Sequence, residues 1–295
     1  MTIPWTPDRL GDLTGRRVIV TGATNGVGLG TARALAKAGA EVILAVRNTE
    51  LGKQRAAQMG GSTAVEKLDL ADLSSVRAFA DRIEAPVDIL INNAGALTDR
   101  RTETVDGFEM TLGTNLLGPF ALTNLLLPKV RSQIINVGSD AHRSATLHLD
   151  DLHLRRHKWT RLGAYAQSKL AVMLWGLELD RRLRAAGSPI VTQLTHPGWV
   201  ASNLSNLGDA PLKAVAHKAV KVVADRLAND IDEGAAPLYC ISEPIPPGSY
   251  VGVSGRFGLR GGPVLIGRTP LACDYDTAAR LVAFAERETG TELRV

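Results

Sequence analysis

Two kinds of hydrophobic pattern alternate along the first half of the chain. Short runs rich in Val and Ile are nearly continuous in apolar residues, which is typical of parallel strands buried on both faces of a sheet. Longer segments with helical periodicity separate these runs. The alternation predicts right-handed strand–helix–strand crossovers and a doubly wound parallel α/β sheet with helices on both faces. Strands are expected within residues 16–22, 40–46, 64–70, 87–95 and 132–139, and helices within residues 28–39, 49–59, 75–85 and about 104–127.

The second half of the chain departs from this strict alternation. A stripe containing Leu170, Met173 and Leu177 predicts a long helix, and the Pro- and Gly-rich stretch 242–263 indicates loops around one short strand near Tyr250. No linker or composition break divides the chain, so we expect a single domain over residues 1–295. The further expected elements are a helix over about 164–186, a strand over 190–196, helix with loops over 200–230 and a closing helix over 276–289.

Composition narrows the class of protein. The 295 residues are 45% hydrophobic and 22% charged, an ordinary globular profile. Aromatic residues make up only 4%, and the net charge of +4 is scattered, so no nucleic-acid partner is indicated. Cys240 and Cys273 form no CxxC pair and are expected to be reduced thiols of a cytoplasmic protein. The first residues lack a signal peptide, no run approaches the ~18 apolar residues of a membrane span, and no membrane anchor is expected.

A glycine-rich turn follows the first predicted strand and opens the first predicted helix. Glycine permits positive φ and lets the backbone approach a pyrophosphate, which then lies on the helix N-terminus. The spacing GxxxGxG differs from the generic GxGxxG, and many such turns are simply tight connections, but the strand before and the helix after favour a nucleotide site. The expected cofactor contacts are Thr21, Gly22, Thr24, Asn25, Gly26, Val27 and Gly28.

The end of the second predicted strand bears on the choice of cofactor. NAD-binding domains place an acidic residue about 20 residues beyond the glycines to bind the ribose 2′-hydroxyl. This strand ends instead in Ala45-Val46-Arg47, without a carboxylate. Arg47 can pair with a 2′-phosphate, although it could also be an exposed arginine that follows a strand. We therefore predict that NADP(H) is preferred over NAD(H).

Tyr165 and Lys169 stand four positions apart in the long predicted helix. This spacing places both side chains on one face, ~6 Å apart along the axis. A phenolate at neutral pH requires ~4 kcal/mol of stabilisation, because tyrosine titrates near pH ~10. An ammonium ~4 Å away supplies about that energy at an effective dielectric constant of ~20. Lys169 is therefore expected to lower the pKa of Tyr165 and make it a general acid/base, although the same spacing alone is common on helix surfaces.

The order of these motifs resembles that of the short-chain dehydrogenase/reductase family over nearly the whole chain. The glycine turn and the Tyr-x-x-x-Lys pair are accompanied by NNAG after the fourth strand and by a Pro-Gly pair after the sixth. The resemblance implies a single-domain Rossmann-type fold, an oxidoreductase activity, and Asn115, Ser139, Tyr165 and Lys169 as catalytic residues. It also implies cofactor contacts at Asp69, Leu70, Asn92, Asn93, Ala94, Gly95, Tyr165, Lys169, Pro197, Gly198, Val200 and Ser202.

Within the family, the segments AVRN, SDAH and AYAQSKLA are similar to those of the retinol-dehydrogenase-like branch. The membrane-anchoring N-terminal helix of animal members of that branch is not seen, so membrane residence is not expected. Ser202 stands where the branch usually has Thr, and it keeps the hydroxyl group. Homodimers or homotetramers are common in the family, but the long helices here carry no decisive interface signature.

The resemblance also implies a role for each catalytic residue. Tyr165 would exchange a proton with the substrate oxygen while hydride passes to or from nicotinamide, and Ser139 would hydrogen-bond the same oxygen. Lys169 would also bind the nicotinamide ribose, and Asn115 would hold a water that links Lys169 to solvent. An Asn satisfied by backbone at a helix kink is compatible with that role.

The substrate is expected to be a small carbonyl or alcohol compound. Residues 200–265 should form a substrate-binding lid, and its apolar residues, with Trp199 and Leu204 as candidate contacts, suggest a lipophilic molecule unless they are core residues. The alternatives are a non-catalytic NADP(H)-sensing protein, or an enzyme of the same fold that acts on a tetrapyrrole or a sugar nucleotide.

Histidines between Ser139 and Tyr165 raise the question of a metal site. His153 and His157 could share a helix face with acidic residues nearby, but the chemistry above requires no metal. We interpret them as surface histidines and expect no metal. His142 and His196 lie at predicted strand ends and are expected to orient loops.

Overall fold

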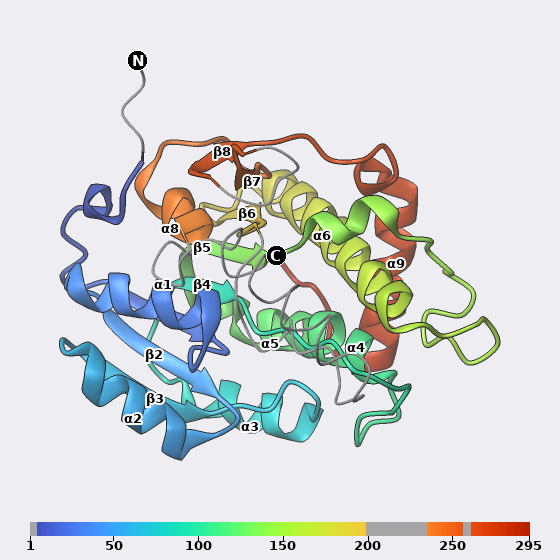
Figure 1. The fold of residues 1–295 in the computed structure, drawn as a ribbon, viewed down its shortest axis with the longest axis horizontal. Coiled ribbons are helices and arrows are strands. Elements are labelled where there is room, and N and C mark those ends of the chain that lie inside the picture. The colour runs from blue at the N-terminus through green and yellow to red at the C-terminus, as the bar shows by residue number, and fades with distance from the viewer. Residues whose placement is uncertain (1–4, 199–234, 256–260) are drawn as a thin grey trace, which may run out of the picture.

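The computed structural model describes residues 5–198, 235–255 and 261–295. Its centre is an eight-stranded sheet with the strand order β3-β2-β1-β4-β5-β6-β7-β8 (Figure 1). Neighbouring strands from β3 to β7 are parallel, whereas β8 pairs antiparallel with β7. The chain reverses its direction across the sheet between β1 and β4, where open α/β sheets bind ligands. The strands are β1 (Arg17–Thr21), β2 (Glu41–Val46), β3 (Thr63–Lys67), β4 (Val87–Asn92), β5 (Val130–Val137), β6 (Val191–Thr195), β7 (Tyr250–Val253) and β8 (Pro263–Leu265).

Helices cover both faces of this sheet. Helices α1, α2 and α8 pack on one face, around a core that includes Val18 and Val20. Helices α3, α5 and α6 pack on the other face, where Phe120 and Trp175 are fully buried, and α9 forms a further layer over α5 and α6. The helices are α1 (Gly26–Lys37), α2 (Thr49–Met59), α3 (Leu73–Arg82), α4 (Met110–Leu112), α5 (Gly118–Leu126), α6 (Arg161–Ala185), α8 (Ala235–Ser242) and α9 (Tyr275–Thr289).

Several element boundaries differ from the sequence expectation. The helix expected from about residue 104 begins only at Met110, because Gly107, at a φ of +82°, turns the chain and Glu103 pairs with Glu109 in an isolated antiparallel bridge. Helix α6 begins earlier than expected, at Arg161, because Thr160 accepts a capping hydrogen bond from the Gly163 N–H. The sheet is also not wholly parallel, since the short edge strand β8 was not expected.

One helical segment of the described residues, Met110–Lys129, is long and apolar enough to cross a membrane by length and composition. Its mean hydropathy is 1.2, so the expectation that no run approaches such a span needs correction. In this fold 78% of the apolar window is buried, and the segment lies in the core formed with α3, α6 and α9. The core of the α/β fold therefore accounts for its hydropathy.

Candidate active site

The sequence-predicted motifs gather at the carboxyl ends of the parallel strands. The glycine turn follows β1, the NNAG loop follows β4, and Ser139 follows β5. Parallel strands end at the same edge of a sheet, so these loops are neighbours. Helix α6 brings Tyr165 and Lys169 to this edge in its first turns.

The glycine turn is fastened to the NNAG loop by hydrogen bonds and by close packing. The Thr21 hydroxyl accepts hydrogen bonds from the N–H groups of Asn93 and Ala94, both at 3.0 Å, and the Asn93 side chain donates to the Thr21 carbonyl at 2.8 Å. A Cβ at position 28 would lie 2.3 Å from Asn93 Nδ2, and Gly22 has a φ of +68° with a Cβ position 2.9 Å from Ala94. The glycines therefore allow the two loops to approach.

The first turn of α1 fits an anionic group. Side chains of Asn48, Asp72, Thr160 and Asp274 cap α2, α3, α6 and α9, but the N-cap residue of α1, Asn25, makes no side-chain capping hydrogen bond. The first turn of α1 also contains no acidic residue. Uncapped N–H groups and the helix dipole favour a phosphate at such a position.

Residues at the ends of β2 and β3 and on α2 add positive charge to this edge. Arg47 is exposed, and its carbonyl oxygen accepts a hydrogen bond of 2.7 Å from Lys67 Nζ. The side chain of Arg55 crosses from α2 to the glycine turn, where its Nε donates to the Thr24 carbonyl at 3.3 Å. These residues, with the turn, fit a phosphorylated nucleotide.

Two other predicted cofactor contacts have local partners. Asp69 accepts a hydrogen bond from the Ala71 N–H at 3.0 Å, which shapes the loop after β3. Asn92 is buried, and its Nδ2 donates to Thr123 and to Asn136 Oδ1, both at 2.9 Å. The Asn92 side chain therefore connects β4, α5 and β5 inside the core, which differs from the expected cofactor contact.

Ser139 and Tyr165 form the polar centre of the site. Ser139 caps a short 3₁₀ turn, and its hydroxyl accepts a hydrogen bond of 3.2 Å from the Ala141 N–H. Burial raises the pKa of Tyr165 above its ordinary value, while a side-chain hydrogen bond with Ser139 acts in the opposite direction. The serine hydroxyl is thus the neighbouring group that favours the tyrosinate.

Lys169 lies beside Tyr165 and is only 4% exposed. Its Nζ donates to the Val137 carbonyl at 2.9 Å and lies 5.7 Å from the centroid of the Tyr165 ring. Burial lowers the pKa of Lys169 to about 8. The expectation that an ammonium near ~4 Å dominates the pKa of Tyr165 is not met, because the lysine is turned to the carbonyl end of β5.

Asn115 occupies a π-helical turn, Gly113–Leu117, between α4 and α5. Its Oδ1 accepts from the Ala96 N–H at 2.6 Å, and its Nδ2 donates to the Ala96 carbonyl at 3.0 Å and to Ser168 Oγ at 2.9 Å. Such π turns are frequent at functional sites. The asparagine thus fixes the loop after β4 to the helix that carries Tyr165.

Other polar residues surround Ser139, and sequence reasoning gave them little weight. His142 Nδ1 lies 2.7 Å from the Ser139 carbonyl, so this ring nitrogen carries the hydrogen. Asp140 lies 3.5 Å from the Tyr250 hydroxyl and 3.8 Å from His196 Nε2. The positions of His142 and His196 at strand ends agree with the expected role of orienting loops. Tyr250 belongs to no sequence motif, so its place beside Asp140 could not be predicted.

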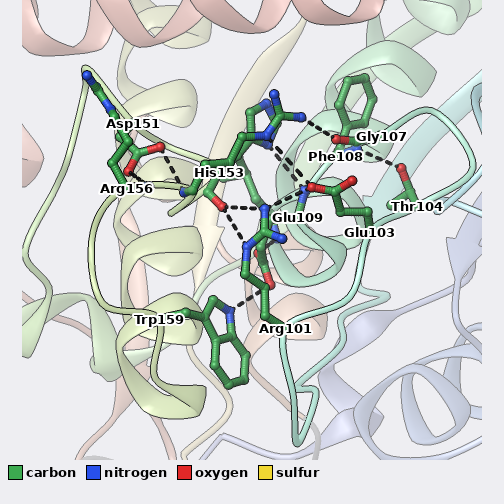
Figure 2. A network of polar contacts seen from close by, with 12 residues as sticks. Arg101, Glu103, Thr104, Gly107, Phe108, Glu109, Asp151, His153, Arg156 and Trp159 are labelled. Carbon is green, nitrogen blue, oxygen red and sulfur yellow. Dashed lines mark hydrogen bonds and ion pairs between the residues drawn. The ribbon is translucent and has the colours of Figure 1, made fainter.

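The histidines of the segment 145–160 differ from the prediction. This segment is not helical, so His153 and His157 share no helix face. His153 is only 8% exposed and stacks on Phe108 with ring centroids 5.7 Å apart, which corrects its interpretation as a surface residue (Figure 2). His157 is half-buried and binds Asp151 at 3.0 Å.

Part of the predicted site lies outside the described residues. Pro197 and Gly198 are described, and Gly198 has a φ of +76° directly after β6. The predicted contacts that lie beyond the described ranges are Trp199, Val200, Ser202 and Leu204, together with most of the expected lid at 200–265.

The fold and the site define a nucleotide-binding α/β protein of the oxidoreductase type. Residues 16–210 match the family described as short chain dehydrogenase. The chain therefore belongs to the short-chain dehydrogenase family. The expected fold class, the resemblance to this family and the expected enzyme class are thus confirmed.

Relatives support the retinol-dehydrogenase-like branch. The chain is 44% identical over 206 residues to mouse polyprenol dehydrogenase, a match that covers 64% of this chain and 61% of the relative. It is also 44% identical over 204 residues to human retinol dehydrogenase 13, covering 65% and 61%. These matches span about 61% of the length of the relatives.

Solved structures agree with the fold over a greater length. An uncharacterized protein of Mycobacterium paratuberculosis is 42% identical, with a TM-score of 0.86, and the match covers 99% of this chain and 100% of the other. A short chain dehydrogenase from Burkholderia cenocepacia, solved in complex with NADP, is 26% identical with a TM-score of 0.60, covering 79% and 93%. The family and this NADP complex therefore support a nicotinamide cofactor.

Proposed function

We propose that this chain is an NADP(H)-dependent oxidoreductase that transfers hydride between nicotinamide and a lipophilic carbonyl or alcohol substrate. The observation that carries the proposal is the convergence of Ser139, Tyr165 and the buried Lys169 at the edge of the sheet that also holds the glycine turn. Lys169 Nζ lies 5.7 Å from the centroid of the Tyr165 ring, and the Ser139 side chain lowers the Tyr165 pKa. A hydroxyl pair beside a buried amine suits proton exchange with a substrate oxygen.

Each residue then has a distinct task in the reaction. The nicotinamide, when bound, supplies or accepts the hydride. Tyr165 gives a proton to the carbonyl oxygen in reduction and takes it back in oxidation, while Ser139 donates a hydrogen bond to the same oxygen. Lys169 carries positive charge at neutral pH, because its pKa of about 8 lies above 7. This charge favours the tyrosinate once the lysine side chain turns from the Val137 carbonyl toward the cofactor ribose.

The preference for NADP(H) rests on the absence of an acidic residue at the end of β2 and on the presence of Arg47 there. A guanidinium pairs with the 2′-phosphate through two hydrogen bonds, whereas NAD(H) offers it only a hydroxyl. Lys67, bound to the Arg47 carbonyl at 2.7 Å, adds a second cation. The NADP complex of the Burkholderia cenocepacia relative supports the same cofactor.

The substrate proposal rests on the relatives and on the composition of the predicted lid. Retinol and polyprenol, named in the two relatives, are both isoprenoid alcohols. Trp199 and Leu204 remain the proposed substrate contacts. Cytoplasmic location and a homodimer or homotetramer remain predictions from the sequence.

A turnover assay tests this function, with NADPH and NADH on a panel of isoprenoid aldehydes and ketones, and with NADP⁺ and NAD⁺ on the corresponding secondary alcohols. We expect oxidation of NADPH with lipophilic aldehydes, and its loss in Tyr165→Phe with NADPH affinity retained. Tight NADPH binding without turnover on any compound would favour the non-catalytic NADP(H)-sensing alternative. Turnover restricted to a sugar nucleotide or a tetrapyrrole would favour the other alternative enzyme.

A further inference from the structure

The described part of the chain buries a carboxylate that the proposed chemistry does not use. Glu109 is 1% exposed. Its Oε1 accepts a hydrogen bond of 3.1 Å from Trp159 Nε1 (Figure 2). Its Oε2 accepts one of 2.8 Å from the Leu112 N–H. Buried polar groups of this kind are costly unless they are satisfied, so each of these bonds constrains its partner.

Both partners of this carboxylate belong to helix starts. Glu109 is the N-cap of α4, which continues through the π turn with Asn115 into α5. Trp159 directly precedes Thr160, the N-cap of α6, which carries Tyr165 and Lys169. One side chain therefore joins the beginnings of the two helices that hold the candidate catalytic residues.

A second link joins the same helices deeper in the site. Asn115 Nδ2 donates to Ser168 Oγ at 2.9 Å, and the Ser168 hydroxyl donates to the Tyr165 carbonyl at 2.8 Å. Two separated links fix both the spacing and the rotation of the helices, which one link alone cannot do. The Glu109–Trp159 bond is the outer of the two.

The backbone of Glu109 is fixed from a third direction. Its N–H donates to His153 Nδ1 at 3.2 Å, so the proton of a neutral ring lies on Nε2, which faces Glu288 of α9 at 3.2 Å. Arg101 donates to the His153 carbonyl at 3.3 Å (Figure 2). The position of Glu109 is therefore determined independently of α6, as a positioning group requires.

We propose that Glu109 is a positioning residue, whose buried carboxylate holds the first turn of α6 so that Tyr165 stays against Ser139. The proposal rests on the proposed function of Tyr165 as general acid/base. Without the bond to Trp159, the start of α6 keeps the ion pair of 3.0 Å between Arg161 and the exposed Asp99 and the inner link at Asn115, and Tyr165 shifts away from Ser139.

The test compares Glu109→Gln, Trp159→Phe and the double variant with the wild type. Glu103→Gln is the matched control, because Glu103 pairs with Glu109 in the same bridge, but among the described residues its side chain forms ion pairs only with Arg101 and Arg155, at the surface. The titration of Tyr165 is followed without substrate by tyrosinate absorbance. Its signal is the difference between each protein and the same protein that also carries Tyr165→Phe. We expect the Tyr165 titration to move to higher pH in both single variants, because the Ser139 hydrogen bond that lowers its pKa weakens.

Kinetics supply the second measurement. We expect kcat to fall about tenfold, with KM and NADPH affinity within about twofold, since the loss of one hydrogen bond acts on the geometry of the reacting groups. The kcat of the double variant should be no lower than that of the less active single variant, because both changes remove the same bond. Glu103→Gln should match the wild type.

The proposal is overturned if Glu109→Gln and Trp159→Phe lower the melting temperature but leave kcat and the Tyr165 titration unchanged. If Glu109→Gln does not fold, Trp159→Phe carries the test, since it removes the indole N–H donor but keeps an aromatic ring at this position. A wild type without turnover on any substrate would contradict the proposed function, while the substrate-free titration would still decide the role of Glu109.

Discussion

At the scale of single residues, Lys169 is a charged group that is buried in the candidate site at a cost in free energy. Its ammonium is almost fully buried and donates to a backbone carbonyl, and no carboxylate of the described residues forms an ion pair with it. Burial without a counter-ion disfavours the charged form, which is why the pKa falls to about 8. A buried ammonium without a counter-ion favours an anion, such as a phenolate, beside it.

The pH dependence of stability follows from this shift. The pKa of Lys169 falls from 10.5 in the unfolded chain to about 8 in the folded one, so between these values the unfolded state binds more protons. The unfolding free energy therefore rises with pH across that window. Below pH ~8, burial of the charged Lys169 lowers the unfolding free energy by its full amount, about 3 kcal/mol.

Lys169→Met should remove this dependence. We expect the unfolding free energy of the wild type, relative to the variant, to increase by about 3 kcal/mol from pH 7 to 10.5, measured by urea denaturation. Lys129→Met is the matched control, because its Nζ also donates to a backbone carbonyl, that of Ala80, but at a half-buried position. A difference that stays constant with pH would contradict the burial argument.

Arg47 allows a prediction on cofactor choice. Arg47→Asp should lower the NADPH/NADH ratio of kcat/KM by about 10- to 100-fold, because charge-assisted hydrogen bonds to the 2′-phosphate are lost and the new carboxylate repels it. Arg280→Asp, at an exposed position of α9, makes the same charge change far from the turn and should leave the ratio unchanged. An unchanged ratio in Arg47→Asp would reject the assignment.

Motif residues could be predicted from the sequence, but the surroundings that set their behaviour could not. The Tyr165–Lys169 spacing correctly placed both residues in one helix, yet the direction of the lysine depends on the Val137 carbonyl, which lies on another element. Likewise, Asn92 and His153 are buried by contacts with distant residues such as Thr123 and Phe108. Such burial is a property of tertiary packing, which local patterns do not contain.

At the scale of elements, the junction between the β1–α1 turn and the β4 loop carries the nucleotide site. Hydrophobic periodicity predicted β1, α1 and β4 well, because strands buried on both faces leave a strong signal. It did not predict the start of α4 or the strand β8, since a glycine turn and a short edge strand have little periodicity. Close approach of the two loops is therefore visible only in the structure.

Gly28→Ala tests this junction. The added Cβ would lie 2.3 Å from Asn93 Nδ2 and 2.7 Å from the Gly22 carbonyl, so the turn must move. We expect a loss of about 1–3 kcal/mol in the unfolding free energy and a strong loss of NADPH affinity, measured by denaturation and by fluorescence titration. Gly267→Ala is the control, because a Cβ there meets nothing within 4 Å. Wild-type affinity in Gly28→Ala would show that the turn does not need this close approach.

At the scale of the whole molecule, α9 connects the C-terminal region to the candidate site. It packs on α6 and α5, and it is held by an ion pair of 2.8 Å between Arg182 and Glu286 and by the bond between Glu288 and His153. The hydrogen bond of 3.0 Å from Asn124 to Thr291 fastens the chain just beyond the helix. The last helix is therefore part of the same cooperative structure as the helices that carry Asn115 and Tyr165.

This arrangement predicts that α9 contributes strongly to global stability. Leu281 is fully buried against the core, so Leu281→Ala should lower the unfolding free energy by about 2–5 kcal/mol in urea denaturation. Arg280→Ala, one position earlier and exposed, should change it by less than about 0.5 kcal/mol. Because α9 and α6 share one core, the loss in Leu281→Ala should appear as a single transition at a lower urea concentration. Separate melting of α9, before the rest of the chain, would instead show that the C-terminal helix is an independent layer and that its tie through His153 to Glu109 is weak.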